Sequence, residues 1–354
     1  AISGLIAVVG ANYDDDNGSS SGSAYIYEYD SNSDTWDETK ITGSGSSAND
    51  SYGGVVAISG TTIAVTSSSS SSSSNYIYQR DPSSGNWQET PILATGLFGS
   101  IAISENTLVL GKKIFGNYID ILDIPVVVKE TKLTASDPTS NDYYGKSVAV
   151  SGGIAVVGAD GDDDNGSMAG SAYIYEFDPS SYTWLETKIT ASDGMASDLF
   201  GEGIAVSGTT VVVGAYGVDD NGSDSGAAYI YQYDPSSDDW QETKLTASDA
   251  AAGDWFGRSV SVSGTTVVVG AVRDDDNGSN SGSAYIYEFD PSDNSWFETK
   301  LVATDGASDD YFARGVSVSG TSVAVSADLD DTNGRIYIFH YDPSVDTWQQ
   351  TKLT

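Results

Sequence analysis

The sequence predicts an all-β fold, a seven-bladed β-propeller with four antiparallel strands in each blade. Two observations predict it. One segment, an aromatic residue and Gly followed by two β-branched runs that flank a Ser-Gly step, recurs along the whole chain. Each copy also carries four runs of strand-forming residues, and seven such units match the repeat length and strand content of propeller blades.

The repeat is visible in six full copies, whose starts lie 46 or 56 residues apart. A seventh, "AISGLIAVVGA", opens the chain without the first residues of the pattern. We therefore expect the inner strand of blade 1 to be shortened. The full copies begin at Tyr52, Phe98, Tyr144, Phe200, Phe256 and Phe312.

Four strands are expected in each unit, as the sixth unit illustrates. Its runs "GRSVSVS", "TTVVVGA", "SAYIYEF" and "SWFETKLV" are rich in β-branched and aromatic residues and are bounded by Gly, Ser, Asp or Pro. "SGTT" predicts a tight hairpin between strands one and two, and "DPS" predicts a turn between strands three and four. The expected strands span 257–263, 265–271, 283–289 and 295–302.

One domain over residues 1–354 is expected, because a ring of blades shares its interfaces. A linear solenoid is the alternative, although solenoid repeats are usually shorter and supply fewer strands. The chain starts at Ala1 without Met, which suggests a processed or partial product. The expected blades span about 1–42, 43–93, 94–134, 135–190, 191–246, 247–302 and 303–354.

The charge of the chain limits its partners. There are 51 acidic and 15 basic residues, a formal charge of −36. Nucleic acid and direct membrane insertion are poor expectations for such a chain, whereas cations, basic proteins or a saline medium suit it. There is no cysteine, and no apolar run approaches the roughly 20 residues of a spanning helix.

Much of the acidic charge is expected on one face. In a four-stranded meander, the loop between strands two and three opens at the same end as the connection to the next blade. Both segments are acidic here, as "DDDNG" and "TASDAAAGDWFG" show. Like charges this close repel unless something neutralises them.

The loops suggest calcium sites. D-x-N-G recurs in five of them and resembles the second half of the D-x-D-x-[DN]-G calcium loop, where oxygen side chains converge and Gly permits a sharp turn. The acids two residues before the aromatic–Gly step are further candidate ligands, and Asp50 has the same position. The simpler alternative is that Asn-Gly is a favoured turn with solvated aspartates. The candidate metal ligands are Asp14, Asp15, Asp16, Asn17, Asp162, Asp163, Asp164, Asn165, Asp219, Asp220, Asn221, Asp274, Asp275, Asp276, Asn277, Asp330, Asp331, Asn333, Asp142, Asp198, Asp254 and Asp310.

The repeat resembles the FG-GAP repeat, known from the seven-bladed head of integrin α chains and from bacterial and algal surface proteins. Phe200-Gly201 with Gly214-Ala215 carries the resemblance best, as does Phe256-Gly257 with Gly270-Ala271. The Pro of the family name is absent in every unit. Integrin calcium loops lie between strands one and two, where this chain has only "SGTT", so those ligands do not transfer. The resemblance implies a propeller, calcium, and adhesion or binding at the cell surface or outside the cell.

Two blades depart from the acidic pattern. Blade 2 carries eight serines, Ser67 to Ser74, and blade 3 carries Lys112 and Lys113 in place of the acidic loop. Either these units have drifted, or they form a contact site for a partner or for the rest of a larger chain. Trp255 lies in an acidic connection and is a further candidate partner-binding residue. The lysines of the "ETK" strands, such as Lys300, are expected to guard an exposed sheet edge.

A binding role is expected rather than catalysis. His340 is the only histidine, and no Ser/His/Asp set, thiol nucleophile or phosphate loop is evident. Carboxylates could form a glycosidase pair, but repetition spreads them around the ring. We expect an extracellular, calcium-dependent adhesion, protein-binding or scaffold module, with a glycan-binding propeller as the alternative. Repeated aromatic-plus-acid pockets would favour glycans, and a single site would favour a protein.

Overall fold

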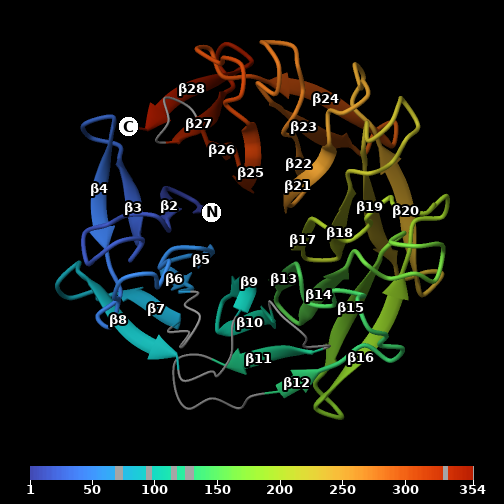
Figure 1. Ribbon diagram of the computed structural model, residues 1–354, viewed down its shortest axis with the longest axis horizontal. Coiled ribbons are helices and arrows are strands. Elements are labelled where there is room, and N and C mark those ends of the chain that lie inside the picture. The colour runs from blue at the N-terminus through green and yellow to red at the C-terminus, as the bar shows by residue number, and fades with distance from the viewer. Residues whose placement is uncertain (68–74, 93–97, 113–117, 124–130, 330–333, 354) are drawn as a thin grey trace.

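The structure, a computed structural model, describes residues 1–67, 75–92, 98–112, 118–123, 131–329 and 334–353, and within these residues the chain is all-β. Its strands form seven sheets, each built from four consecutive antiparallel strands. The sheets stand as blades around a central opening, with the first strand of each blade innermost (Figure 1). The predicted seven-bladed propeller is confirmed.

The strand bounds are as follows. Blade 1 comprises β1 (Ile2–Ser3), β2 (Ile6–Ala11), β3 (Ser23–Asp30) and β4 (Thr35–Ile41). Blade 2 comprises β5 (Val56–Ser59), β6 (Thr62–Val65), β7 (Asn75–Arg80) and β8 (Trp87–Ile92). Blade 3 comprises β9 (Phe98–Ser104), β10 (Thr107–Lys112), β11 (Ile119–Asp123) and β12 (Thr131–Leu133). Blade 4 comprises β13 (Val148–Ser151), β14 (Ile154–Ala159), β15 (Ser171–Asp178) and β16 (Thr183–Ile189). Blade 5 comprises β17 (Ile204–Ser207), β18 (Thr210–Ala215), β19 (Ala227–Asp234) and β20 (Asp239–Leu245). Blade 6 comprises β21 (Phe256–Ser263), β22 (Thr266–Ala271), β23 (Ser283–Asp290) and β24 (Ser295–Leu301). Blade 7 comprises β25 (Phe312–Ser319), β26 (Ser322–Ala327), β27 (Arg335–Asp342) and β28 (Thr347–Leu353).

The core lies between neighbouring blades. The second strand of blade 6 reads Thr-Val-Val-Val, and Val267, Val268 and Val269 are all fully buried because both faces of this strand are covered by adjacent blades. Phe256 is buried at the start of the same blade, with its ring 5.4 Å from that of Tyr285 in an edge-on arrangement. Continuous apolar runs therefore form the middle strands, as expected for sheets covered on both sides.

The Phe-Gly and Gly-Ala steps are explained by one backbone contact between blades. A Cβ atom on Gly214 would overlap the carbonyl oxygen of Gly257 in the next blade, and a Cβ on Gly158 would overlap that of Gly201. Gly257 also adopts a φ of 89°, which favours glycine. The repeat keeps these glycines because two backbones meet there without room for a side chain.

A ring of hydrogen bonds joins the tight hairpins between strands one and two. In each blade the serine that ends the first strand accepts a backbone N–H from the hairpin of the next blade, at 2.9 to 3.1 Å. The last bond, from the Gly4 N–H to Ser319, connects blade 7 to blade 1 and closes the ring. The serines are Ser3, Ser59, Ser104, Ser151, Ser207, Ser263 and Ser319.

Blade 1 has a shortened inner strand, as expected. β1 spans two residues, whereas the complete inner strands β21 and β25 span eight. Ile2 pairs with Ala7 in its own blade, and its N–H donates to the Ser317 hydroxyl of blade 7 at 3.0 Å. The interface with blade 7 thus compensates for the missing pairing.

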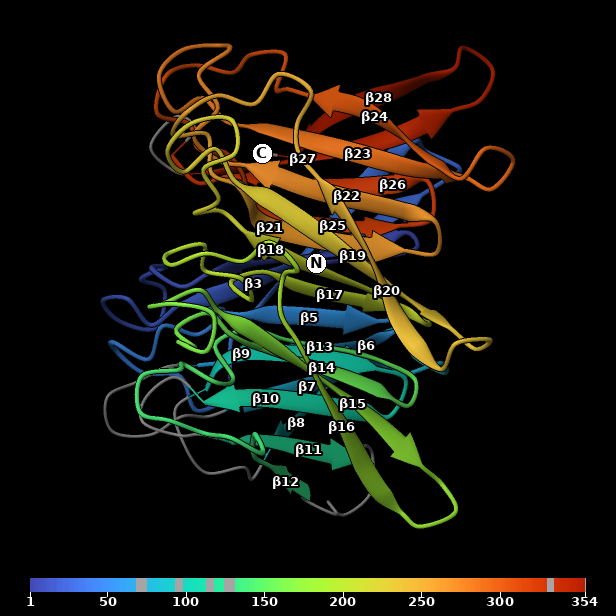
Figure 2. The same ribbon diagram turned by 90° about the vertical axis from the view of Figure 1, so that its right-hand side faces the viewer.

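The loops between strands two and three form one face with the connections between blades, as predicted; we call it the loop face. Hairpins occupy the opposite face, the hairpin face (Figure 2). Each loop lies between two connections. In blade 6 the Arg273 N–H donates to Asp254 in the incoming connection, while Ser279 and Asn280 accept N–H groups of Asp309 and Tyr311 in the outgoing one. In blade 6 the loop is therefore hydrogen-bonded to both neighbouring connections.

Candidate functional sites on the loop face

Lysine-centred aspartate clusters are the most regular feature of the loop face. In blade 6 the Lys300 ammonium lies 2.7 Å from Asp249, 2.9 Å from Asp274 and 2.6 Å from Asp276. The Tyr285 hydroxyl donates to Asp249 and Asp274 as well. Although burial opposes both shifts, Lys300 lowers the pKa of Asp249, and the three carboxylates raise the pKa of Lys300. The cluster is thus held in its charged form.

The same cluster recurs with variations. Blade 4 repeats it in full, with Lys188 at 2.6 to 2.9 Å from Asp137, Asp162 and Asp164. In both blades one carboxylate oxygen from each of the three acids lies within 4.8 Å of the others. Blades 1, 5 and 7 carry partial versions, which are Lys40 with Asp14 and Asp16, Lys244 with Asp193 and Asp220, and Lys352 with Asp305.

Blade 2 lacks both partners of this cluster. Pro91 pairs with Tyr76 in the register where Lys300 pairs with Tyr285. Gly45 takes the place of the connection aspartate, and its N–H donates to the Tyr76 hydroxyl at 3.3 Å. Blade 2 therefore lacks both the lysine and the connection aspartate, whereas blade 3 keeps Lys132 although Gly96 takes the place of its connection aspartate.

The aspartates three residues before the loop glycine cap turns instead of joining these clusters. Asp275 accepts the N–H of Asn280 at 2.7 Å, and Asp163 accepts that of Met168 at the same distance. Asn280 and Met168 both have positive φ angles, so the caps fix a strained turn. Asp15 and Asp219 make the equivalent bonds to Ser20 and Asp224.

The buried connection aspartates also cap turns. Asp254 accepts the N–H of Ala251 at 2.7 Å, and Asp142, Asp198 and Asp310 make the same bond in their own connections. Burial, together with the nearby carboxylates of Asp274 and Asp275, raises the pKa of Asp254 to about 6. Among the described residues, neither Asp254 nor Asp275 makes an ion pair. This carboxylate pair is the least neutralised part of blade 6.

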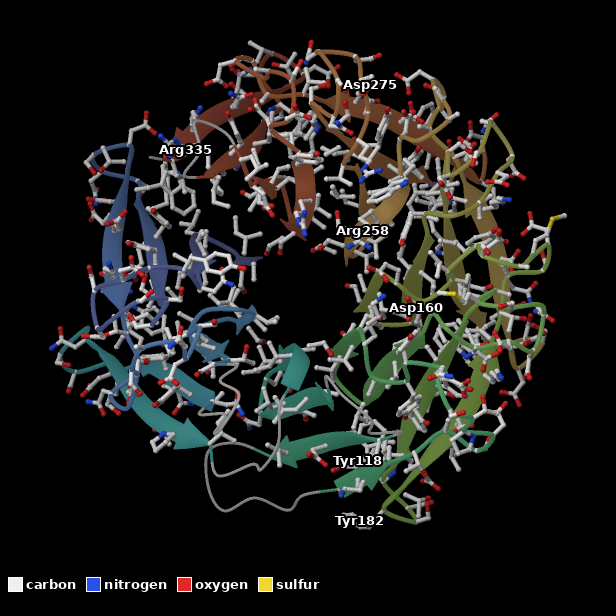
Figure 3. All side chains as sticks on the ribbon, viewed as in Figure 1. Tyr118, Asp160, Tyr182, Arg258, Asp275 and Arg335 are labelled. Carbon is white, nitrogen blue, oxygen red and sulfur yellow. The ribbon has the colours of Figure 1, made fainter. Side chains whose placement is uncertain are left out.

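A mixed-charge network lies at the mouth of the central opening, across blades 4 to 6 (Figure 3). Lys146 lies 2.5 Å from both Asp160 and Glu202, and Glu202 also pairs with Arg258 of the next blade. Asp160 is 1% exposed, and burial raises its pKa to about 6. Ion pairs thus connect the segments at the start of the inner strands of three consecutive blades.

An aromatic–arginine cluster adjoins this network. The Trp255 ring lies 5.0 Å from that of Tyr216, and the Arg273 guanidinium lies 3.4 Å from the centre of the Trp255 ring. Arg258 lies 5.0 Å from the Tyr216 ring centre. Trp255 has a positive φ of 58°, an unfavourable conformation for a bulky residue. Cation–π and ring contacts fix the four side chains relative to one another.

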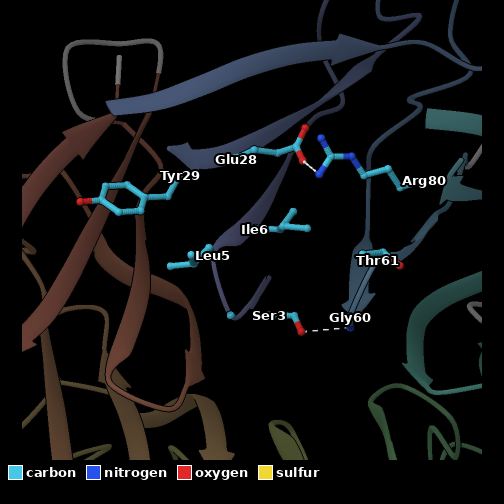
Figure 4. Close-up of a pocket in the computed structure, with 9 residues that line it drawn as sticks. Ser3, Leu5, Ile6, Glu28, Tyr29, Gly60, Thr61 and Arg80 are labelled. Carbon is cyan, nitrogen blue, oxygen red and sulfur yellow. Dashed lines mark hydrogen bonds and ion pairs between the residues drawn. The ribbon is translucent and has the colours of Figure 1, made fainter. Parts of the chain in front are cut away.

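The hairpin face carries an open cavity of about 500 Å³ between blades 1 and 2 (Figure 4). Leu5, Ile6 and Tyr29 line it, and an ion pair of 2.8 Å between Arg80 and Glu28 crosses one wall. In the other described third strands, except β11, an aromatic ring packs against the tryptophan of the fourth strand, as Phe289 does against Trp296. Arg80 takes the place of that ring in blade 2, where it pairs with Trp87. Replacement of that ring by arginine accounts for the hollow.

Comparison with known proteins assigns the chain to a family. The family model described as FG-GAP repeat matches residues 1–27, 127–175, 184–231, 240–287 and 296–339, together more than half of the chain. The chain belongs to the FG-GAP repeat family. The stretch without a match, 28–126, contains blade 2 and most of blade 3 of this FG-GAP propeller, the two blades that lack the acidic loop. FG-GAP repeats are typical of extracellular proteins.

Solved structures support the propeller fold. Hsv2 from Kluyveromyces lactis matches with a TM-score of 0.52 at 11% sequence identity, covering 94% of this chain and 92% of that chain. A second structure of Kluyveromyces lactis Hsv2, with complete loop 6CD, matches with a TM-score of 0.50 at 10% identity over the same shares. At these identities the likeness shows the fold alone. No curated protein sequence matches the chain.

No helix within the described residues of the FG-GAP propeller is long and apolar enough to cross a membrane. His340, whose Nδ1 lies 3.0 Å from the Ser322 hydroxyl, is an exposed residue of β27.

The structure separates the predicted metal ligands into two groups. Asp14, Asp16, Asp162, Asp164, Asp220, Asp274 and Asp276 face lysines, whereas Asp15, Asp163, Asp219, Asp275, Asp142, Asp198, Asp254 and Asp310 cap turns. The same turns contain Asn17, Asn165, Asn221 and Asn277. The backbone N–H groups of Asn17, Asn221 and Asn277 each donate to a loop serine. Asp330, Asp331, Asn333 and Lys113 lie outside the described residues, and Lys112 ends β10.

Sequence reasoning missed half of each lysine-centred cluster. Asp137 and Asp249 were not among the candidates, and the lysines were expected only to guard a sheet edge. Contact between Lys300 and Asp249 spans 51 residues of sequence, so no local spacing reveals it. Blade 2 lacks both lysine and aspartate, but blade 3 keeps Lys132 where Gly96 replaces the aspartate, so the sequence carries only a partial signal.

The oxygen-only donors of these loops suit a hard cation, but the two groups differ in how well they fit calcium. At Asp249, Asp274 and Asp276 the Lys300 ammonium occupies the centre, so calcium would have to displace a lysine. The carboxylates of Asp254 and Asp275 have no such ammonium between them. A cation would thus meet no competing lysine at Asp254 and Asp275, whereas the described groups of three converging carboxylates are the triads.

Proposed function

We propose that this FG-GAP propeller is a binding module of an extracellular or cell-surface protein, and that it holds a protein partner on its loop face with the help of calcium. The observation that carries the proposal is the aromatic–arginine cluster of Tyr216, Trp255, Arg258 and Arg273. Tyrosine, tryptophan and arginine are the side chains most enriched at the energetic centres of protein interfaces.

The position of the cluster supports a protein partner over a glycan. It is built from blades 5 and 6, and its member Arg258 lies near the central opening (Figure 3). The residues equivalent to Trp255 are Tyr143, Leu199 and Tyr311, and those equivalent to Arg273 are Tyr13, Gly161, Gly217 and Leu329. A single cluster with a charged rim suits one protein epitope, whereas a ring of equivalent sugar pockets would repeat it.

Calcium is proposed at the loop carboxylates that lysine leaves unneutralised. The raised pKa of Asp254, due to burial and the neighbouring Asp274 and Asp275, indicates a site where a cation would relieve repulsion. Blade 5 has the same arrangement, since burial and the carboxylates of Asp193 and Asp219 raise the pKa of Asp198. Bound calcium would stabilise the loop face, by about 2.7 kcal/mol at a hundredfold excess over its dissociation constant.

The test combines a stability and a capture experiment. We expect chelation to lower the melting temperature, and calcium to restore it better than sodium chloride of equal ionic strength, because screening alone treats the two salts alike. Asp254→Asn with Asp275→Asn should abolish the calcium response, whereas Asp290→Asn on the hairpin face should leave it intact. Equal effects of both salts would remove calcium from the proposal.

Capture of partners on immobilised protein tests the binding role itself. A partner that depends on the loop face should be lost with Trp255→Ala and retained with Arg80→Leu, a change on the hairpin face. Retention of every captured protein by Trp255→Ala would refute a partner site at this cluster.

A further inference from the structure

Within the described part of the chain, the side chain of Arg273 differs from those of the other four arginines because it has no hydrogen-bonding partner. Arg80, Arg258 and Arg314 each form an ion pair with a carboxylate, and Arg335 donates to a backbone carbonyl at 2.9 Å. Among the described residues, the Arg273 side chain has neither an ion pair nor a hydrogen bond, and its buried Nε is unpartnered. In a chain with 51 acids and 15 bases, an arginine without a carboxylate is unexpected.

The guanidinium of Arg273 is nevertheless held in place. Its central carbon lies 3.4 Å from the centre of the Trp255 ring, which in turn contacts Tyr216. A guanidinium stacked on a ring keeps its N–H groups free at the edge of its plane, where they match the two oxygens of a carboxylate. The donors are therefore oriented before any ligand arrives.

The local backbone shows that arginine is not required by the fold. The equivalent loop position is Gly161 in blade 4, where a Cβ would overlap the Asn141 carbonyl oxygen, and Leu329 in blade 7. The turn thus forms both with glycine and with leucine at this position. Since the loop does not need Arg273, its N–H groups are available for recognition.

The surroundings restrict which carboxylates can bind. Asp254, Asp274 and Asp275 lie in the same blade, and the whole chain carries a charge of −36. A free anion is repelled by such a field at distances up to about 8–10 Å. A carboxylate that sits within a basic protein surface is instead drawn in, because its neighbouring lysines or arginines face the acidic loops while it reaches Arg273.

We propose that Arg273, stacked on Trp255, receives a carboxylate side chain that a basic protein partner presents to the loop face. This inference rests on the proposed function and specifies the chemistry of its partner. Arg273 supplies selectivity for the carboxylate, Trp255 positions the guanidinium, and the acidic loops attract the basic residues around it.

The test uses two capped lysine-rich peptides that differ only in one central residue, glutamate or glutamine. Calorimetry at about 0.15 M salt measures affinity, and the nitrogen-15 signal of the Arg273 Nε–H reports on its hydrogen bonding. We expect the glutamate peptide to bind about tenfold more tightly than the glutamine peptide, and to shift the Arg273 signal, because charge-assisted bonds to guanidinium are strong.

Variants separate recognition from general charge. Arg273→Leu copies Leu329 of blade 7, and Arg273→Lys keeps the charge but loses the planar fork; both should abolish the preference for glutamate. Arg80→Leu makes the same charge change on the hairpin face and should preserve it.

Equal binding of the two peptides to the unaltered protein, or a preference that persists in Arg273→Leu, overturns the inference. In that case, loop-face binding of the basic peptides still supports the proposed function, whereas failure of both peptides to bind counts against both. If a glucuronate oligosaccharide binds through Arg273 while the peptides show no preference, the ligand of Arg273 is a sugar acid and the inference of a protein carboxylate is wrong.

Discussion

Removal of Lys300 tests whether lysine holds the loop face together. Lys300→Met leaves Asp249, Asp274 and Asp276 without their ammonium. The side chain of Asp274 is 4% exposed, and a buried carboxylate that loses its partner typically costs about 3–5 kcal/mol. The side chains of Asp249 and Asp276 are 42% and 62% exposed. Because these two carboxylates can turn toward water, the expected loss of unfolding free energy falls to about 2–3 kcal/mol.

The corresponding change in melting temperature is measurable. For 354 residues the entropy of unfolding is about 0.7 kcal/mol per kelvin, so the melting temperature should fall by about 3–4 °C. Scanning calorimetry in the presence of a chelator measures this shift without a contribution from calcium.

Blade 5 supplies the matched control. Val218 stands there in place of the buried aspartate, and Lys244 pairs with Asp193 and Asp220, which are 47% and 51% exposed. Lys244→Met should therefore cost at most about 1 kcal/mol. Asp274→Val added to Lys300→Met copies the Lys244→Met variant of blade 5 and should recover most of the loss. Equal losses for Lys244→Met and Lys300→Met would refute the role assigned to the buried carboxylate.

The pH dependence of this difference follows from the shifted pKa of Asp249. Lys300 holds that pKa below its ordinary value, so the stabilisation is complete above about pH 4, the unfolded-state value, and is lost as the pH falls through the lower folded-state value. The gap between the protein and Lys300→Met should shrink in acid, which urea unfolding at pH 7 and pH 3 measures. A gap that stays constant would contradict the ion-pair origin.

Three further predictions concern single positions. Asp254→Asn should stabilise the calcium-free protein by about 2 kcal/mol at pH 7.5 and not at pH 4. The raised pKa of Asp254 means that the folded protein loses stability as the pH rises from about 4 to 6, and asparagine removes this loss. Urea unfolding at both pH values tests the prediction, and an equal effect at both would contradict it. Gly214→Ala should prevent formation of the native ring, since its Cβ would overlap the Gly257 carbonyl, so a native circular dichroism spectrum would contradict the contact. Ser263→Ala removes the bond to the Gly320 N–H and should lower the unfolding free energy by about 1 kcal/mol in a chemical denaturation; an unchanged midpoint would show that this bond does not contribute.

The repeat made the fold predictable, because the four strands of a blade can be recognised within the sequence of each unit. "TTVVVGA" and "SAYIYEF" are covered by blades on both sides, so their apolar content is high, and the turns between strands carry Gly, Pro and Asp where the backbone needs them. The shortened β1 could be predicted for the same reason, since its pattern is incomplete.

The candidate sites were less predictable, because they depend on contacts between units. Glu298 and Lys300 of the outer strand bind Ser248 and Asp249 at the start of the incoming connection. The "ETK" strand of a blade and the "TASD" segment that precedes that blade are about 50 residues apart and contact each other only in the folded chain. Local spacing suggested a metal loop where the structure places a lysine at the centre of the carboxylates.

The aromatic–arginine cluster was also beyond sequence reasoning. Trp255 was a candidate partner-binding residue because of its place in an acidic connection, whereas Arg273 was not among the candidates. Their contact requires a positive φ at Trp255 and the hydrogen bond from the Arg273 N–H to Asp254. Both are properties of the interlocked loops and cannot be read from either segment separately.

Within the described residues every sheet is made from four consecutive strands, and no blade takes a strand from the other end of the chain. The ring closes through an interface between blades 7 and 1, which includes the bonds of Ser317 and Ser319 to the first residues. A circular permutant cut between any two blades, with Thr354 joined to Ala1 by a segment like the other connections, would keep all seven sheets whole. The order of blades around the ring is thus separable from the point at which the polypeptide starts, and whole blades become interchangeable cassettes for protein engineering.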